Sequence, residues 1–214
     1  MSRAVVISGG SIDDYGCARS LIDGGDCVIC ADSGIVHCEK MGITADLIVG
    51  DFDSCDAGTA LELSSAKGAK TEVLQCEKDD TDTEHALMCA CKMGFKNILI
   101  LGALGGRADH TLANIFMLEK LNSLGVRAQI ANENNVIEFL KNSSVTVKAD
   151  GFKYVSVVPV SETANGVTLT GFKYPLADAV MHRASTLGIS NEITGAYGTV
   201  TVRDGSVLVI KSKD

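Results

Sequence analysis

Short runs of apolar residues, separated by stretches of helical spacing, fill the first half of the chain. The runs cover residues 4–8, 27–31, 47–49, 72–74 and 97–101. Buried parallel strands have such continuous apolar runs, and the helices that connect them lie between the runs in sequence. The pattern therefore predicts an α/β unit in which helices cover a parallel sheet.

Two helix starts are marked within this half. Residues 81–84 are Thr-Asp-Thr-Glu, the pattern of a capping box, and apolar residues follow it at helical spacing. A second helix is predicted to begin near Asp109, with Leu112, Ile115 and Phe116 facing the core.

From about Asn134 onward, apolar and polar positions alternate with a period of two residues. Valine occupies every second position in several stretches, and β-branched residues pack well in sheets. Turn dipeptides separate these stretches, and each can supply the positive φ of a two-residue hairpin: Asp150-Gly151, Asn165-Gly166 and Asp204-Gly205. We therefore expect an α/β domain over residues 1–130 and an all-β domain, a small sandwich or half-barrel, over residues 131–214.

Composition and charge narrow the classes of function. The formal charge is −8, which disfavours nucleic acid as a partner. No apolar run approaches the roughly 20 residues that span a bilayer, and the first residues do not contain a signal-peptide core. The 8 cysteines all lie between Cys17 and Cys91, which favours reduced thiols and a cytoplasmic location. Cys27 and Cys30 have the spacing of zinc ligands but fall within a predicted strand, so we do not expect zinc.

Aspartates follow the predicted strands at the points where the strands end. In chain order they are Asp32, Asp51, Asp53, Asp79, Asp80, Asp82 and Asp109. The carboxyl ends of parallel strands open onto one edge of a sheet, so several of these carboxylates should meet there. A hard divalent cation neutralises such a cluster, and Mg²⁺ commonly shares carboxylates with nucleotide phosphates. Taken singly, each aspartate is also a common cap or turn residue. Together they predict a site for Mg-ATP.

The loop of residues 102–107, Gly-Ala-Leu-Gly-Gly-Arg, follows the most apolar of the predicted strands. Its glycines allow backbone amides to approach phosphate, and Arg107 offers a forked donor, although a tight turn requires glycine equally. The loop matches neither a Walker nor a Rossmann fingerprint. His110 is placed either against a substrate or one layer behind it, whereas His37 and His85 are expected to be packing or surface residues. No motif of a covalent nucleophile is present.

Longer motifs, taken in order along the chain, resemble those of one enzyme family. They are ADSG at 31–34, ADLIVGDFDS at 45–54, EKDDTDTE at 77–84, LGALGGRADHTLANI at 101–115, TLTGFKYPL at 168–176 and GISNE at 188–192. Over nearly its whole length the chain is similar to bacterial thiamine pyrophosphokinases. The resemblance implies a Rossmann-like α/β catalytic domain, a C-terminal β-sandwich that helps bind thiamine, and a homodimer with active sites between subunits.

The resemblance also implies a reaction. The hydroxyl of thiamine attacks the β-phosphorus of ATP, the diphosphoryl group moves, AMP leaves, and Mg²⁺ is required. Positions matching the family's motifs assign Asp32, Asp51, Asp53 and Asp82 to the metal, Lys78, Thr81, Gly105, Gly106 and Arg107 to ATP, and Asp109, Ser190 and Asn191 to thiamine. Catalysis would then depend on Asp53, Asp82 and Arg107, which agrees with the positioning and charge neutralisation that phosphoryl transfer needs.

One position departs from the family, and other functions can use the same residues. Animal members stack the vitamin on a tryptophan, and this chain has none. Tyr197 is a candidate replacement, although a buried core tyrosine is the favoured interpretation. The alternatives are a catalytically silent sensor of thiamine or nucleotide and a magnesium-dependent phosphohydrolase. A silent sensor has no need of the metal-binding acids, so their retention favours the transferase.

Overall fold

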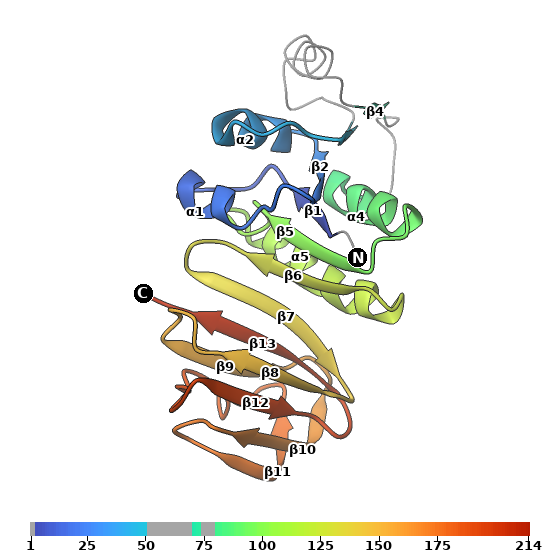
Figure 1. The fold of residues 1–214 in the computed structure, drawn as a ribbon. Helices are drawn as coiled ribbons and strands as arrows, with labels where there is room; N and C mark the ends of the chain where they lie inside the picture. Colours follow the sequence, from blue (N-terminus) through green and yellow to red (C-terminus); the bar gives the residue numbers. More distant parts are fainter. Residues whose placement is uncertain (1–2, 51–69, 74–79) are drawn as a thin grey trace. The chain divides into compact units, whose positions relative to one another are not determined.

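The computed structural model describes residues 3–50, 70–73 and 80–214, and its contacts divide the chain into two compact units, Met1–Glu133 and Asn134–Asp214 (Figure 1). The first unit contains a parallel sheet in the order β4-β3-β2-β1-β5-β6. Its strands are β1 (Ala4–Ile7), β2 (Cys27–Ala31), β3 (Leu47–Gly50), β4 (Lys70–Val73), β5 (Asn97–Leu101) and β6 (Arg127–Ala131). Each apolar run predicted as a strand overlaps one of β1 to β5, residue 74 lies outside the described residues, and β6 is an addition.

Four helices in the described part of this unit connect the strands. They are α1 (Tyr15–Ser20), α2 (Gly34–Met41), α4 (Asp82–Lys92) and α5 (Ala108–Ser123). From β1 to β4 the strands add on one side of β1, and β5 and β6 lie on its other side. Right-handed crossovers place the helices of the two directions on opposite faces, in agreement with the packing of α1 on α2 and of α4 on α5. The sheet is therefore doubly wound, with its switch point between β1 and β5.

The start of α4 follows one half of the predicted capping box. The Thr81 hydroxyl accepts a hydrogen bond from the Glu84 backbone N–H at 3.2 Å, so Thr81 is the N-cap. The Glu84 carboxylate instead pairs with Lys120 Nζ of α5 at 2.6 Å. Leu87 and Ala90 are fully buried and anchor the helix on the sheet. The cap by Thr81 and the ion pair of Glu84 with Lys120 thus both hold the first turn of α4 in place.

The inward face predicted for α5 is wrong at two of its three residues, and the third, Ile115, is half-buried. Leu112 and Phe116 are 53% and 56% exposed, whereas the buried residues are Asn114, Leu118 and Leu121. Apolar residues surround most of this helix, so their spacing does not determine which side faces the sheet. The structure therefore leaves an apolar stripe of α5 at the surface of the first unit.

The second unit contains two antiparallel sheets. In one, β13 (Ser206–Ser212) pairs with β7 (Asn135–Lys141) and β9 (Tyr154–Pro159). The other has the order β11-β10-β12-β8, formed by Leu176–His182, Thr163–Thr170, Tyr197–Thr201 and Ser144–Lys148. One cluster of buried side chains draws on strands of both sheets, including Val157 and Val209 from the first and Leu169 and Val200 from the second. This shared core confirms the predicted C-terminal β-sandwich.

The predicted two-residue hairpins are wrong. Gly166 has φ +65°, but it lies inside β10, where the register to β11 shifts. Residues 150–151 connect β8 to β9, and residues 204–205 connect β12 to β13, so both join strands of different sheets. A positive φ suits a bulge or a change of sheet as well as a hairpin, and the dipeptide does not distinguish them.

Two further features concern the cysteines and the apolarity of the helices. The described cysteines carry thiols rather than disulfides, and Cys30 Sγ in β2 lies 3.0 Å from Cys38 Sγ in α2. Within the described residues, no helix combines the length and apolarity needed to cross a bilayer.

Candidate active site

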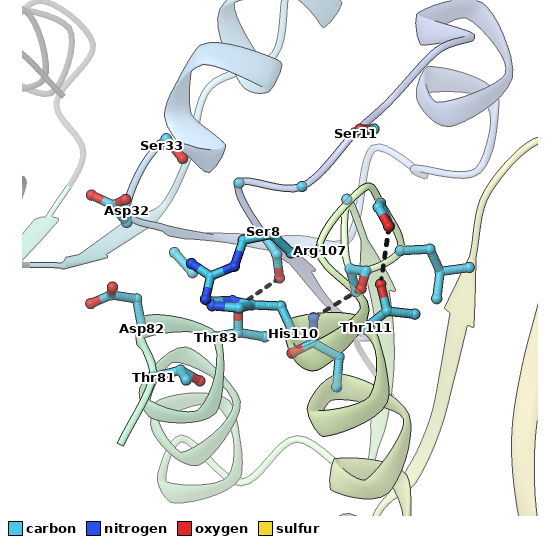
Figure 2. Close-up of a pocket in the computed structure, with 18 of the residues that line it drawn as sticks. Ser8, Ser11, Asp32, Ser33, Thr81, Asp82, Thr83, Arg107, His110 and Thr111 are labelled. Carbon is cyan, nitrogen blue, oxygen red and sulfur yellow. Dashed lines mark hydrogen bonds between the residues drawn. The ribbon is translucent and has the colours of Figure 1, made fainter. Parts of the chain in front are cut away.

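A pocket of about 500 Å³ lies in the first unit, where the strands flanking the switch point end (Figure 2). Open α/β sheets bind ligands at this position because the connections after the two central strands diverge there. The lining consists of residues 8–11 after β1, 31–33 after β2, 81–83 at the start of α4, 102–107 after β5, and His110, Thr111 and Asn114 of α5. Chain segments far apart in sequence thus form one concave surface.

Two of the predicted metal-binding acids line this pocket. Asp32 follows β2 with φ +48°, a left-handed conformation that aspartate adopts more readily than most residues, and its N–H donates to Val49 O of β3 at 2.7 Å. Asp82 is the first residue of α4. The structure therefore brings Asp32 and Asp82 to one cavity, as the sequence predicts (Figure 2).

Three other residues that the sequence predicts to bind metal or phosphate lie outside the described residues: Asp51, Asp53 and Lys78. Within the ranges 3–50, 70–73 and 80–214, no group of three or more His, Cys, Asp and Glu side chains is arranged to hold a metal ion. The described part of the site therefore contributes Asp32 and Asp82 to any cation-binding set.

The glycine-rich connections after β1 and β5 are packed against one another. The Gly10 N–H donates to Gly102 O at 2.8 Å, and a Cβ added to Gly10 would collide with that same oxygen. A Cβ added to Gly102 would collide with Ser8 O. Only glycine allows this approach of the two backbones, so these residues bring the two loops together at the pocket.

Backbone donors line the pocket between these loops. Among the described residues, the N–H groups of Ser11, Leu104 and Gly106 have no backbone acceptor. The Gly105 N–H donates to Thr111 Oγ1 at 3.2 Å, and that hydroxyl lies 3.3 Å from Gly105 O. Backbone N–H groups of lining residues that lack a backbone acceptor are available to an anion such as phosphate.

Arg107 lines the same pocket and forms an ion pair with Asp109. Its Nε and Nη2 lie 3.2 Å and 2.6 Å from the two carboxylate oxygens. The hydrogen bond from Arg107 lowers the pKa of Asp109 to about 2, so this carboxylate is ionised at neutral pH. Asp109 is not among the pocket-lining residues. In this structure it orients Arg107.

Sequence reasoning missed two polar contacts among the lining residues. Asn114 is 8% exposed, and its Nδ2 donates to Ala103 O at 2.9 Å. Thr83 Oγ1 donates to Ser8 Oγ at 3.0 Å and so joins α4 to the end of β1. Asn114 and Leu118 lie on the same, buried face of α5. A polar residue on a buried face signals a functional contact, but the sequence prediction placed the wrong face of α5 inward and so missed it.

We expect Asn114→Ala to lower the free energy of unfolding by about 1–3 kcal/mol, because the buried Ala103 carbonyl loses its donor. The loop that begins at Gly102 should also lose its fixed position at the pocket. Urea unfolding checks the first effect. Asn122→Ala is the matched control, since Asn122 is exposed near the end of α5. Equal destabilisation by both variants would contradict this role.

The residues predicted to contact thiamine in the second unit make local contacts. Asn191 is buried: its Nδ2 donates to Tyr174 O at 2.7 Å, and its Oδ1 accepts from the N–H groups of Tyr174 and Glu192. Ser190 has φ +57°, and its N–H donates to Ser156 Oγ at 3.0 Å. Tyr197 is 57% exposed, so its interpretation as a core residue is wrong. As the first residue of β12 it packs little of its ring and leaves most of it open to solvent.

Comparisons with known proteins agree with this architecture. Residues 18–130 match the family model "Thiamin pyrophosphokinase, catalytic domain", and residues 142–207 match "Thiamin pyrophosphokinase, vitamin B1 binding domain". The chain is 36% identical over 184 residues to thiamine pyrophosphokinase of Bacillus subtilis (strain 168), covering 86% of each protein.

Solved structures of such proteins superpose on the whole chain. The crystal structure of thiamine pyrophosphokinase from Bacillus subtilis aligns with a TM-score of 0.90 at 33% identity and covers 100% of both chains. That of thiamin pyrophosphokinase from Geobacillus thermodenitrificans aligns with a TM-score of 0.88 at 34% identity, covering 100% of this chain and 98% of the other.

Proposed function

Because this chain belongs to the thiamin pyrophosphokinase family and makes thiamine diphosphate from thiamine and ATP, we propose that the pocket at the switch point is its ATP site. The observation that carries the proposal is the meeting in one cavity of two carboxylates, of residues whose backbone N–H groups have no backbone acceptor, and of Arg107. Each kind of group suits a metal-bound triphosphate, since carboxylates hold the metal ion while N–H groups and arginine bind and neutralise phosphate oxygens.

The donor set of the pocket fits Mg²⁺. The carboxylates of Asp32 and Asp82 are hard oxygen ligands, no cysteine is among the described residues that line the pocket, and Mg²⁺ prefers oxygen donors with water and phosphate completing its shell. We assign Asp32 and Asp82 to this cation, together with Asp51 and Asp53, which lie outside the described residues. When bound, Mg²⁺ neutralises charge on the phosphate oxygens.

The chain's own residues then hold the triphosphate for attack. The N–H groups of the loops after β1 and β5 bind phosphate oxygens, with Gly105, Gly106 and Thr81 at the lining. Arg107 neutralises charge that develops as the diphosphoryl group moves from ATP to the thiamine hydroxyl and AMP leaves. Asp82 and Asp53 keep the catalytic role assigned from the sequence, and Lys78 its place at the phosphates. These residues position the reactants and need form no covalent bond to the substrate themselves, since diphosphoryl transfer needs in-line geometry and charge compensation.

Thiamine binding is assigned to the second unit and to Asp109. The exposed ring of Tyr197 offers a face for a cationic or aromatic ligand ring, and Ser190 lies seven residues before it in the chain. The contacts of Asn191 hold residues 174 and 192 together, so its contribution to thiamine binding is to shape this segment.

Surface and thiol chemistry support proposals for the assembly and the location. We propose a homodimer, because exposed Leu112 and Phe116 on α5 and exposed Leu187 and Ile189 in the second unit are apolar side chains that a partner subunit would cover. We also propose a cytoplasmic location, because the described cysteines are thiols, as expected in a reducing compartment.

Product analysis tests the proposed function. Purified protein incubated with Mg-ATP and thiamine should release AMP and thiamine diphosphate in equal amounts, and only when thiamine is present. Formation of ADP, or hydrolysis without thiamine, would identify a phosphohydrolase instead. Binding of ATP or thiamine without any turnover would identify a sensor.

A further inference from the structure

His37 lies behind the pocket and is hydrogen-bonded through both of its ring nitrogens. Nε2 is 2.7 Å from the carbonyl oxygen of Gly10, which lines the pocket. Nδ1 is 2.8 Å from the hydroxyl of Tyr15, the first residue of α1. His37 itself belongs to α2 and is not among the lining residues. As the sequence leads us to expect, His37 is a packing residue, and its two hydrogen bonds show what it packs against.

These partners determine which nitrogen carries the proton. A carbonyl oxygen only accepts, so Nε2 must donate to Gly10 O. The Tyr15 hydroxyl then donates to Nδ1, which completes one chain of hydrogen bonds from α1 through α2 to the loop after β1. Burial lowers the pKa of His37, so the neutral ring with its proton on Nε2 is the form present at neutral pH.

The bond to Gly10 O also fixes the following N–H. In a trans peptide the carbonyl of one residue and the N–H of the next point in opposite directions. With its carbonyl held by His37, the Gly10–Ser11 peptide directs the Ser11 N–H away from α2. That nitrogen lies beside the loop after β5, since a Cβ added to Gly105 would be 3.1 Å from it. Ser11 and Gly105 both line the pocket.

Because residue 10 is a glycine, the orientation of its peptide planes depends on contacts such as the hydrogen bond from His37. The Gly9-Gly10 segment has no side chains to oppose rotation of its peptide planes. A rotated Gly10–Ser11 peptide would present its carbonyl oxygen to the cavity, and that oxygen would repel a phosphate. The Gly10 N–H is tied to Gly102 O, so His37 restrains the remaining side of this residue.

We propose that His37, oriented by Tyr15, is a positioning residue that directs the Ser11 N–H toward the phosphates of ATP. The inference rests on the proposed function, because it takes the pocket to be the ATP site. It assigns to the Tyr15-His37-Gly10 chain a role in nucleotide affinity, separate from thiamine binding and from the reacting groups.

Two amide substitutions at this position form the central test. The side-chain nitrogen of Gln can take the place of Nε2, whereas that of Asn takes the place of Nδ1 and falls short of Gly10 O. We expect His37→Gln to keep the KM for ATP within about threefold of the parent, and His37→Asn and His37→Leu to raise it about tenfold or more through loss of a bond to a charged ligand. The KM for thiamine and the kcat should change by less than about threefold.

Binding of ATP measured calorimetrically should follow the same order, and Tyr15→Phe should weaken it less than His37→Leu, since it leaves Nε2 in place. Urea unfolding of each variant separates affinity from stability. Should the Leu variant fail to fold, the pair of amide variants decides. Equal ATP affinity for the Gln and Asn variants, or parallel increases in both KM values, would overturn the inference. Absence of thiamine-dependent AMP from the unmodified protein would instead reject the proposed function.

Discussion

Replacing Asp82 with Asn should lower the rate of thiamine-dependent AMP formation on the order of 100-fold while the fold stays intact. Asp82 lines the pocket at the start of α4, and we assign it to Mg²⁺. The amide keeps the size of the side chain and removes its charge, so the loss isolates the carboxylate. Initial rates over a series of Mg²⁺ concentrations measure it, and the variant should also need more Mg²⁺ to reach half of its maximal rate.

Glu84→Gln is the matched control for this substitution. Both residues are acids in the first turn of the same helix, where a negative charge contributes about 0.3–1 kcal/mol to helix stability. Glu84 pairs with Lys120 and does not line the pocket. We expect the control to retain near-normal activity. If the two variants lose activity equally, Asp82 acts through the stability of α4 and its assignment to the metal is wrong.

Replacing Arg107 with Gln should lower kcat/KM for ATP by roughly 100-fold, because the pocket loses the cation that opposes the charge of the phosphates. The Arg107 side chain is 71% exposed, so we expect little change in the urea midpoint. This decrease in kcat/KM would not arise from a change in the protonation of Asp109, the ion-pair partner of Arg107. Asp109 has a pKa of about 2 in the ion pair and stays ionised at neutral pH even if that pKa returns to the ordinary value.

Arg203→Gln provides the comparison for a charge change alone. Arg203 is an arginine of the second unit, 67% exposed and paired with Asp178 at 2.9 Å. Its loss changes the net charge of the chain by the same amount and should leave kcat/KM within about twofold of the parent. A similar decrease for both variants would show that the overall charge of the protein, rather than the position of Arg107, governs ATP binding.

The strands of the first unit could be predicted because burial on both faces requires a continuous apolar run, which surface loops and amphipathic helices do not have. The phase of α5 could not, since Leu112 and Phe116 are as apolar as the buried Leu118 and Leu121. The turn dipeptides of the second unit failed for a related reason: φ at Gly166 is a local property, whereas the strands that a turn joins are set by the packing of two sheets.

In the candidate site too, some residues could be predicted from the sequence and others could not. Asp32, Asp82 and the loop of residues 102–107 were predictable because chemistry at the carboxyl edge of a parallel sheet leaves polar residues directly after apolar runs. Asn114 and His37 were not, because each acts through a hydrogen bond to a backbone carbonyl of another segment. A carbonyl is present at every position, so nothing in the sequence marks which one a side chain will hold.

The pairing of β1 with β5 has a consequence for the order in which the protein acquires its ligand. Ala4 pairs with Ile98, so the two loops that pack together beside the pocket leave the ribosome far apart in time. A nascent chain that has released only its first fifty residues already carries Gly10 and Asp32 but not the opposite wall. Nucleotide therefore cannot assist early steps of folding during translation, and it can stabilise the first unit only after the central strands have joined.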